Sequence, residues 1–159
     1  MARPALRAAN PSDDALIERY ARRGSECAYS NLKMLARVAG NVYDEALRPV
    51  DLRAGQLALM WAILAAGPVE MGRLGFITVT DQTTLSRTIA NLKKARLVSV
   101  KAGQDRRVKL VSLTPTGRQR FREAMPYWED AQRRASAIMP VAEVRTLARL
   151  VRRAARGAA

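Results

Sequence analysis

The chain has 159 residues, 48% of them hydrophobic, which suits one globular domain with a core and argues against intrinsic disorder. Lys and Arg number 28 against 14 Asp and Glu, and the net charge of +14 favours a polyanionic partner, nucleic acid before an acidic membrane. With no histidine and one cysteine, the sequence excludes His-based catalysis, His-ligated metals, intrachain disulfides and Cys-cluster zinc sites, so we expect no enzyme, metal or cofactor.

The N-terminal third predicts a tail followed by helices. Residues 1–15 contain two prolines and a polar stretch, which predicts a flexible tail and a helix capped by Ser12 or Asp13. No signal peptide or membrane span is indicated, so we expect a cytoplasmic protein without a membrane partner. Residues 14–48 are expected to be mostly helical, and Pro49 ends this segment. Their apolar stripe fits either burial in the chain's own core or half of a dimer interface: Ala28, Leu32, Leu35, Ala39, Val42 and Ala46.

The middle of the chain has the spacing of a helix-turn-helix motif. Predicted helices cover residues 53–66, 69–76 and 82–95, with a turn at 77–79 and Thr80 or Asp81 as the last helix's N-cap. Residues 71–113 carry a net charge of +7, half of the total. The spacing therefore favours a DNA-reading role for the third of these helices.

The helix over 82–95 has one packing face and one polar face. Leu85, Ile89, Leu92 and the stem of Arg96 share the first face. The opposite face and its flanks carry hydroxyls, an amide and cations, a pattern that suits the major groove, where Arg reads guanine and Asn reads adenine. An ordinary amphipathic surface helix would show a similar pattern, and the preceding short helix and turn favour DNA.

A β-hairpin is predicted next, with strands at 97–101 and 108–113. Its loop places Arg106 and Arg107 at the tip, where they would suit a narrow minor groove, with Asp105 near enough to orient one guanidinium. The alternative is a solvated turn.

Two further helices are expected at the C-terminus. The first begins with Thr114 as N-cap and Pro115 at the first position, runs to about 139, and is kinked or split by Pro126. The second covers 140–156 and has this apolar face: Val144, Leu147, Leu150 and Val151.

Two stretches, DQTTLSRTIANLKKARLV at 81–98 and DRRVKLVSLTPTG at 105–117, resemble the recognition helix and the wing of MarR-family winged-helix transcription regulators. The resemblance implies a mainly α fold with a small β wing, in which a winged helix-turn-helix region at 53–113 joins an all-helical dimerisation region. The dimerisation helices would lie at 16–52 and 114–159. One departure is Gly75 in the short helix, where the family usually has alanine.

The resemblance further implies an obligate homodimer that binds double-stranded DNA at a pseudo-palindromic operator, as a ligand-responsive regulator and specifically a repressor. The recognition helix would contact bases or phosphates, Lys93 and Lys94 would lie near the backbone, and an arginine of the wing would enter the minor groove. The DNA-binding residues expected on this basis are Gln82, Thr83, Thr84, Ser86, Arg87, Asn91, Lys93, Lys94, Asp105, Arg106 and Arg107.

Family members commonly bind a small effector between the dimerisation helices and the winged helix. We expect an aromatic carboxylate or its CoA thioester, with Arg19, Arg22 and Arg23 as candidates for holding the acid. The aromatic and Met candidates fit a plain core equally well. The expected ligand-binding residues are Arg22, Cys27, Asn31, Met34, Tyr43, Met60, Trp61 and Trp128.

Two other functions remain open at this point. One is a non-sequence-specific architectural DNA-binding protein, which the net charge permits. The other is a thiol-based oxidant-sensing repressor that uses Cys27, although the cysteine position of that branch of the family aligns with Tyr29, and Glu26 would raise the pKa of the thiol if it lay close.

Overall fold

The computed structural model describes residues 11–105 and 107–157, in two compact units, Met1–Ala39 and Gly40–Ala159. In the first unit, α1 (Pro11–Arg23) and the 3₁₀ turn η1 (Gly24–Glu26) precede α2 (Ala28–Ala46), which continues into the second unit. The predicted tail at 1–15 is therefore too long, since helix begins at Pro11. Ser12 and Asp13 lie inside α1 rather than at its cap, because proline suits a first helical position.

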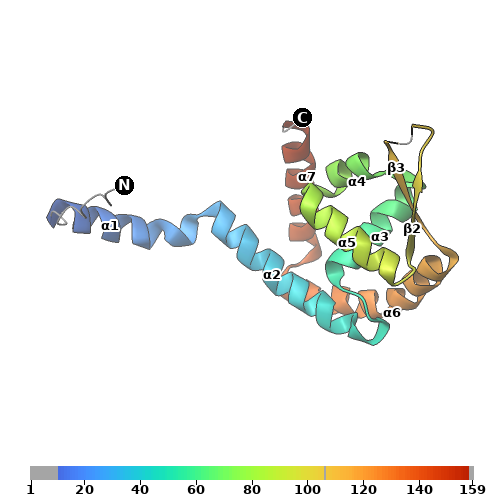
Figure 1. Cartoon of the computed structure of the whole chain (residues 1–159). Coiled ribbons are helices and arrows are strands. Elements are labelled where there is room, and N and C mark those ends of the chain that lie inside the picture. Colours follow the sequence, from blue (N-terminus) through green and yellow to red (C-terminus); the bar gives the residue numbers. More distant parts are fainter. Residues whose placement is uncertain (1–10, 106, 158–159) are drawn as a thin grey trace. The chain divides into compact units, whose positions relative to one another are not determined.

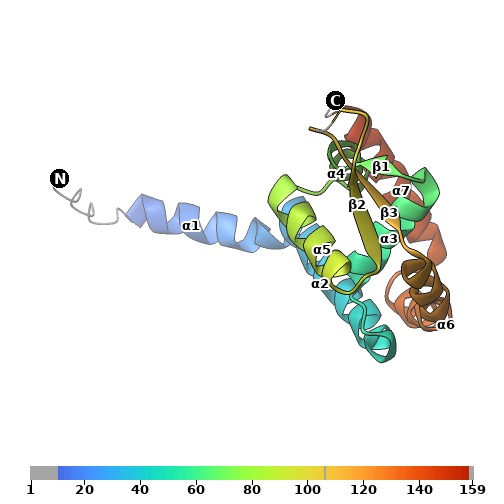
Figure 2. The same cartoon turned by 45° about the vertical axis from the view of Figure 1, so that its right-hand side comes forward.

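The second unit has the element order of a winged helix. After η2 (Arg48–Val50) come α3 (Ala54–Ala66), β1 (Val69–Glu70), α4 (Met71–Thr78) and α5 (Gln82–Lys94), then the strands β2 (Val98–Ala102) and β3 (Lys109–Leu113). Two long helices follow, α6 (Pro115–Ile138) and α7 (Val141–Gly157). Figure 1 and Figure 2 both show the β2–β3 hairpin beside α3 and α5, which agrees with the packing of β2 on α5 and of β3 on α3.

The sheet is antiparallel with strand order β1-β3-β2. Val98 pairs with Leu113 and Ala102 with Lys109, so β2 and β3 form the predicted hairpin. Val69 pairs with Val111, which makes residues 69–70 a short strand and starts α4 at Met71 instead of residue 69. A strand of two residues is too short to leave a periodic signal in the sequence.

The core of the second unit lies between α3, α4, α5 and the sheet. Its fully buried side chains come from every one of these elements and from the α2–η2 corner, and the largest are Leu47, Met60, Ile63, Leu74, Leu85, Leu92 and Val111. Close packing of this kind fixes the position of α5 relative to the wing.

Two predictions about the C-terminal helices differ in outcome. Thr114 caps α6 by accepting a hydrogen bond from the Gly117 backbone N–H at 2.9 Å, with Pro115 at the first helical position, as predicted. Pro126, however, does not split the helix, since α6 continues through it to Ile138. Gly117 is required for packing, because a Cβ there would lie 1.9 Å from the carbonyl oxygen of Leu97.

Candidate nucleic-acid interface

Helix α5 has the two faces that its sequence predicts. Leu85, Ile89 and Leu92 are buried. The predicted DNA-contacting side chains on this helix are all exposed: Gln82, Thr83, Thr84, Ser86, Arg87, Asn91, Lys93 and Lys94. Arg96 was expected on the packing face, but it follows the helix with φ of 59° and is exposed, so its stem does not pack there.

The N-terminus of α5 is capped by Asp81. Its carboxylate accepts a hydrogen bond from the Thr84 backbone N–H at 2.9 Å, and this bond holds the pKa of Asp81 below its usual value. This cap stabilises the first turn of the helix. The outward side chains of that region, Thr83 and Ser86, are exposed and accessible to a partner.

The turn between α4 and α5 is tight. Val79 ends α4 in a left-handed conformation with φ of 49°, and the Thr80 N–H donates to the Gly75 carbonyl at 3.0 Å. A Cβ on Gly75 would lie 3.2 Å from the Thr80 carbonyl oxygen and 3.3 Å from Leu85 Cδ2, closer than most side chains pack. Glycine at residue 75, where the resembling family usually has alanine, therefore allows α4 and α5 to approach closely at this turn.

The wing loop is ordered by Asp105. Its carboxylate accepts from the Arg107 backbone N–H at 2.9 Å, and the Val108 N–H donates to the Asp105 carbonyl at 2.9 Å. The predicted contact of Asp105 with a guanidinium is not formed by Arg107. A carboxylate two residues before the N–H forms an Asx turn more readily. Arg106 lies outside the described residues.

A groove of about 400 Å³ joins the start of α5 to the wing. Gln82 and Ser86 line it from the helix, and Arg107 and Lys109 line it from the hairpin. Glu70 of β1 lines it too and was not predicted, because its strand carries no periodic signal. One surface thus combines amide, hydroxyl and cationic side chains from helix and wing, the two elements with which winged helices read DNA.

A second cavity, of about 610 Å³, is apolar and aromatic. Tyr43 of α2, Trp61 of α3 and Trp128 of α6 line it, and the two tryptophan rings lie 5.2 Å apart at 53°. The Tyr43 hydroxyl donates a hydrogen bond to Gln132 Oε1, and burial raises the pKa of Tyr43. The prediction that Met60 lines a ligand cavity is wrong, because its side chain is buried in the core and is 0% exposed.

The remaining ligand candidates belong to the first unit. Asn31 donates through Nδ2 to the Ser25 carbonyl at 2.7 Å, and Met34 is exposed. Arg22 lies in α1, and its side chain is outside the described part of the chain. The cavity above is lined by residues of the second unit, whereas Cys27, Asn31 and Met34 belong to the first.

The pKa of the Cys27 thiol is lowered, whereas a nearby Glu26 was expected to raise it. The Ser30 backbone N–H and hydroxyl lower its pKa by hydrogen bonds to the sulfur, and the thiol is exposed. Glu26 instead pairs with Arg23, whose Nε lies 3.1 Å from its carboxylate, so the neighbouring negative charge is compensated.

Within residues 11–105 and 107–157, no cluster of acidic, His or Cys side chains is suited to a metal ion, and no helix has the length and apolar character to cross a bilayer.

Residues 52–117 match the family described as winged helix DNA-binding domain. An uncharacterized HTH-type transcriptional regulator of Bacillus subtilis, YwoH, is 27% identical over 88 residues, which are 55% of this chain and 64% of that protein's length. The chain thus carries a winged helix of the type found in transcription regulators, which are not enzymes.

Two solved structures are similar over most of their length. The M. tuberculosis transcriptional regulator MosR, in a complex with DNA, is 30% identical with a TM-score of 0.72, over 83% of this chain and 96% of that one. Bordetella bronchiseptica BpsR, whose DNA binding is regulated by 6-hydroxynicotinic acid, is 26% identical with a TM-score of 0.71, over 82% and 94%. Both are MarR-family regulators, and the present chain belongs to the MarR family of winged-helix transcription regulators.

Proposed function

We propose that this protein is a ligand-responsive, sequence-specific repressor that binds a pseudo-palindromic operator as a homodimer and is released by a small aromatic acid or its CoA thioester. The observation that carries the proposal is the joint groove of α5 and the wing, in which Gln82, Ser86 and Arg107 face the same space.

We assign the recognition of DNA bases to the exposed face of α5. Gln82, Arg87 and Asn91 carry the groups that pair with base edges, amides for adenine and guanidinium for guanine. Arg107 and Arg106 of the wing are assigned to the minor groove, and Lys93 and Lys94 to phosphates. The complex of MosR with DNA supports this assignment by analogy.

The homodimer is supported by the unpartnered apolar face of α7. Val144 is 42% exposed and Val151 is 52% exposed, although both lie on the apolar side of a strongly amphipathic helix. The stripe on α2 adds to this, since Leu32 is 53% exposed while Ala46 is buried in the second unit's core. A second copy would cover such faces and space two recognition helices about one DNA turn apart.

The aromatic effector is assigned to the cavity of Tyr43, Trp61 and Trp128. The two indole rings and the Tyr43 hydroxyl offer stacking and one polar contact to a planar ring. The acid group has no cationic partner among the described lining residues, so its candidates remain Arg19, Arg22 and Arg23. BpsR, which responds to an aromatic acid, supports the ligand class. We assign the protein to the cytoplasm, where DNA and such acids meet.

The experiment is fluorescence anisotropy with DNA from just upstream of the protein's own gene, beside a scrambled duplex of equal length, at about 150 mM salt. We expect nanomolar binding to the first and binding at least about a thousandfold weaker to the second. The specific probe then serves to test release by a panel of aromatic acids. Equal, salt-sensitive binding to both duplexes would instead identify a general DNA-binding protein.

A second candidate trigger is oxidation of Cys27, which the exposed thiol with its lowered pKa favours. Mass spectrometry after stoichiometric organic hydroperoxide tests it, together with anisotropy on the same sample. An unmodified Cys27 with unchanged DNA binding excludes this trigger.

A further inference from the structure

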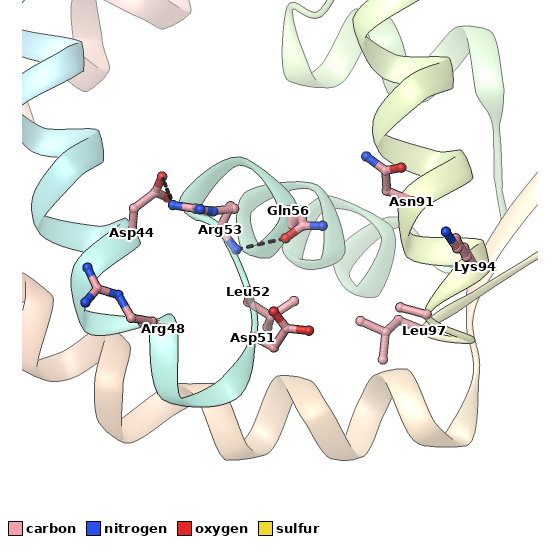
Figure 3. Close-up of a pocket in the computed structure, with 10 residues that line it drawn as sticks. Asp44, Arg48, Asp51, Leu52, Arg53, Gln56, Asn91, Lys94 and Leu97 are labelled. Carbon is pink, nitrogen blue, oxygen red and sulfur yellow. Dashed lines mark hydrogen bonds and ion pairs between the residues drawn. The ribbon is translucent and has the colours of Figure 1, made fainter.

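A polar pocket of about 550 Å³ lies at the C-terminal end of α5, apart from both sites described above. Figure 3 shows Arg48 of η2 on one side and Lys94 of α5 on the other, with Gln56 and Asp51 between them. Asn91 lines the pocket from α5, one helical turn before Lys94. Two segments that are distant in the sequence, 44–56 and 91–97, therefore line one space with charged and amide residues.

Part of this charge is already used within the protein. Asp44 Oδ1 accepts from the Ala54 N–H at 2.7 Å, and Asp44 Oδ2 lies 3.3 Å from the Arg53 guanidinium. Asp44 thereby caps α3, whose N-cap residue Arg53 has no acceptor of its own. The Gln56 Oε1 accepts from the Arg53 N–H at 2.8 Å, which leaves the Gln56 amide NH₂ as a donor toward the pocket.

The other charged groups of the pocket are unmatched. Among the described residues, the side chains of Arg48, Lys94 and Asp51 make no hydrogen bond or ion pair. With Asp44 and Arg53 neutralising each other, these three leave two positive charges and one negative charge. A ligand with two carboxylates and one ammonium has the complementary set, and its net charge of −1 balances the pocket's +1.

The position of Lys94 argues against a base-reading role for this residue. Gln82, at the wing groove, and Lys94, at this pocket, are separated by twelve residues of α5, about 18 Å along the helix axis. Recognition helices contact base edges chiefly with their N-terminal residues, so Lys94, assigned above to a phosphate, is available to an anionic ligand that competes with DNA.

We propose that this pocket binds a small amino-dicarboxylate, of the chemical class of the acidic amino acids, with its carboxylates on Arg48 and Lys94 and its ammonium on Asp51. The bound ligand neutralises Lys94 and links the end of α5 to η2, and it weakens DNA binding. This coupling rests on the proposed function, whereas ligand binding itself does not.

The binding test uses the full ¹⁵N-labelled chain without DNA, titrated with L-glutamate or with L-glutamine at constant ionic strength. Glutamine has the same shape but lacks one carboxylate. We expect saturable shifts of the Asp51, Asn91 and Lys94 amides with glutamate, and binding about tenfold weaker with glutamine. Arg48→Gln should weaken glutamate binding by about tenfold, and Arg118→Gln, which removes an exposed arginine of α6, should not.

Asp51→Asn separates the ammonium contact from a general charge effect. Asparagine tolerates the left-handed backbone at this residue, with φ of 51°, so the fold should be retained. The variant should weaken L-glutamate and strengthen glutarate, which has no ammonium group. Equal changes for both ligands would overturn the assignment of Asp51.

DNA binding provides the second readout. Saturating glutamate should weaken operator binding by about fivefold or more at matched ionic strength, and Arg48→Gln should abolish the effect. The proposal is overturned by the absence of saturable shifts, by equal binding to Arg48→Gln, or by no effect on DNA. It is also overturned if Arg48→Gln flattens the salt dependence of DNA binding, since the pocket would then hold a DNA phosphate. Loss of all specific DNA binding in the unmodified protein would count against the proposed function, not against glutamate binding.

Discussion

A substitution of Arg87 tests most directly whether α5 recognises DNA bases. Arg87 is exposed on α5, on the side opposite the buried Leu85 and Ile89, which is the side proposed above to contact base edges. Arg87→Ala should lower affinity for the specific duplex by about 1–3 kcal/mol and leave affinity for random DNA nearly unchanged. Anisotropy with both duplexes measures this. An equal loss on both would assign Arg87 to a phosphate.

Cys27 has a pKa whose shift carries a clear pH prediction. The Ser30 backbone N–H and hydroxyl both favour the thiolate, and Ser30→Ala removes the hydroxyl alone. Alkylation of the unmodified protein by iodoacetamide should therefore reach its half-maximal rate at a lower pH than alkylation of the variant. Because the chain has one cysteine, whole-protein mass spectrometry reports this site alone. Coinciding pH profiles for the two proteins would show that the Ser30 hydroxyl does not activate the thiol.

Gly117 joins two elements, and its substitution tests how the wing is held on α6. A methyl group there would meet the Leu97 carbonyl oxygen at 1.9 Å, and backbone cannot yield as a flexible side chain can. Gly117→Ala should therefore destabilise the fold by about 3 kcal/mol or more. Gly72→Ala is the matched control. It adds a methyl group in open space within α4 and should stabilise by up to about 1 kcal/mol.

Urea unfolding of both glycine variants measures the difference. Similar stabilities would mean that Leu97 moves to admit the methyl group, and the contact between the end of α5 and the start of α6 would then be softer than the packing indicates. The Gly117 N–H bond to Thr114 would be expected to persist in that case.

Elements with local chemical signals were predictable from the sequence. Asp81 and Thr114 mark helix starts, and the period of Leu85, Ile89 and Leu92 gives the buried face of α5. The break between α1 and α2 at Gly24–Glu26 was not predicted, although Gly and Ser are residues that favour turns. Met60 was misassigned because α3 is apolar on every side, so periodicity does not separate its core face from the side of Trp61.

The candidate sites followed the same division. The exposed polar face of α5, proposed to bind DNA, lies on one helix, and one helical period predicts that exposure. Glu70 of the wing groove and the set of Arg48, Asp51 and Lys94 depend on how distant segments pack. Their positions follow from the fold of the second unit, and no spacing in the sequence encodes them.

At the scale of the whole molecule, the exposed apolar face of α7 leads to a prediction about assembly. Val144 and Val151 lie seven residues apart, so both point to the same side of the helix, and both are about half exposed within one chain. Placing carboxylates there by Val144→Asp with Val151→Asp should prevent burial against a second copy. The variant should sediment as a monomer, while the unmodified protein sediments as a dimer.

The same variant should lose most of its operator affinity, because one winged helix then engages one half-site without the second. Ala142→Asp, with Val144 and Val151 intact, introduces an aspartate on the exposed side of α7 away from the apolar face and should leave both assembly and DNA binding intact. Analytical ultracentrifugation and anisotropy on the same samples test the link. A monomeric variant with undiminished operator binding would separate DNA recognition from dimerisation, and the operator would then need only a single half-site.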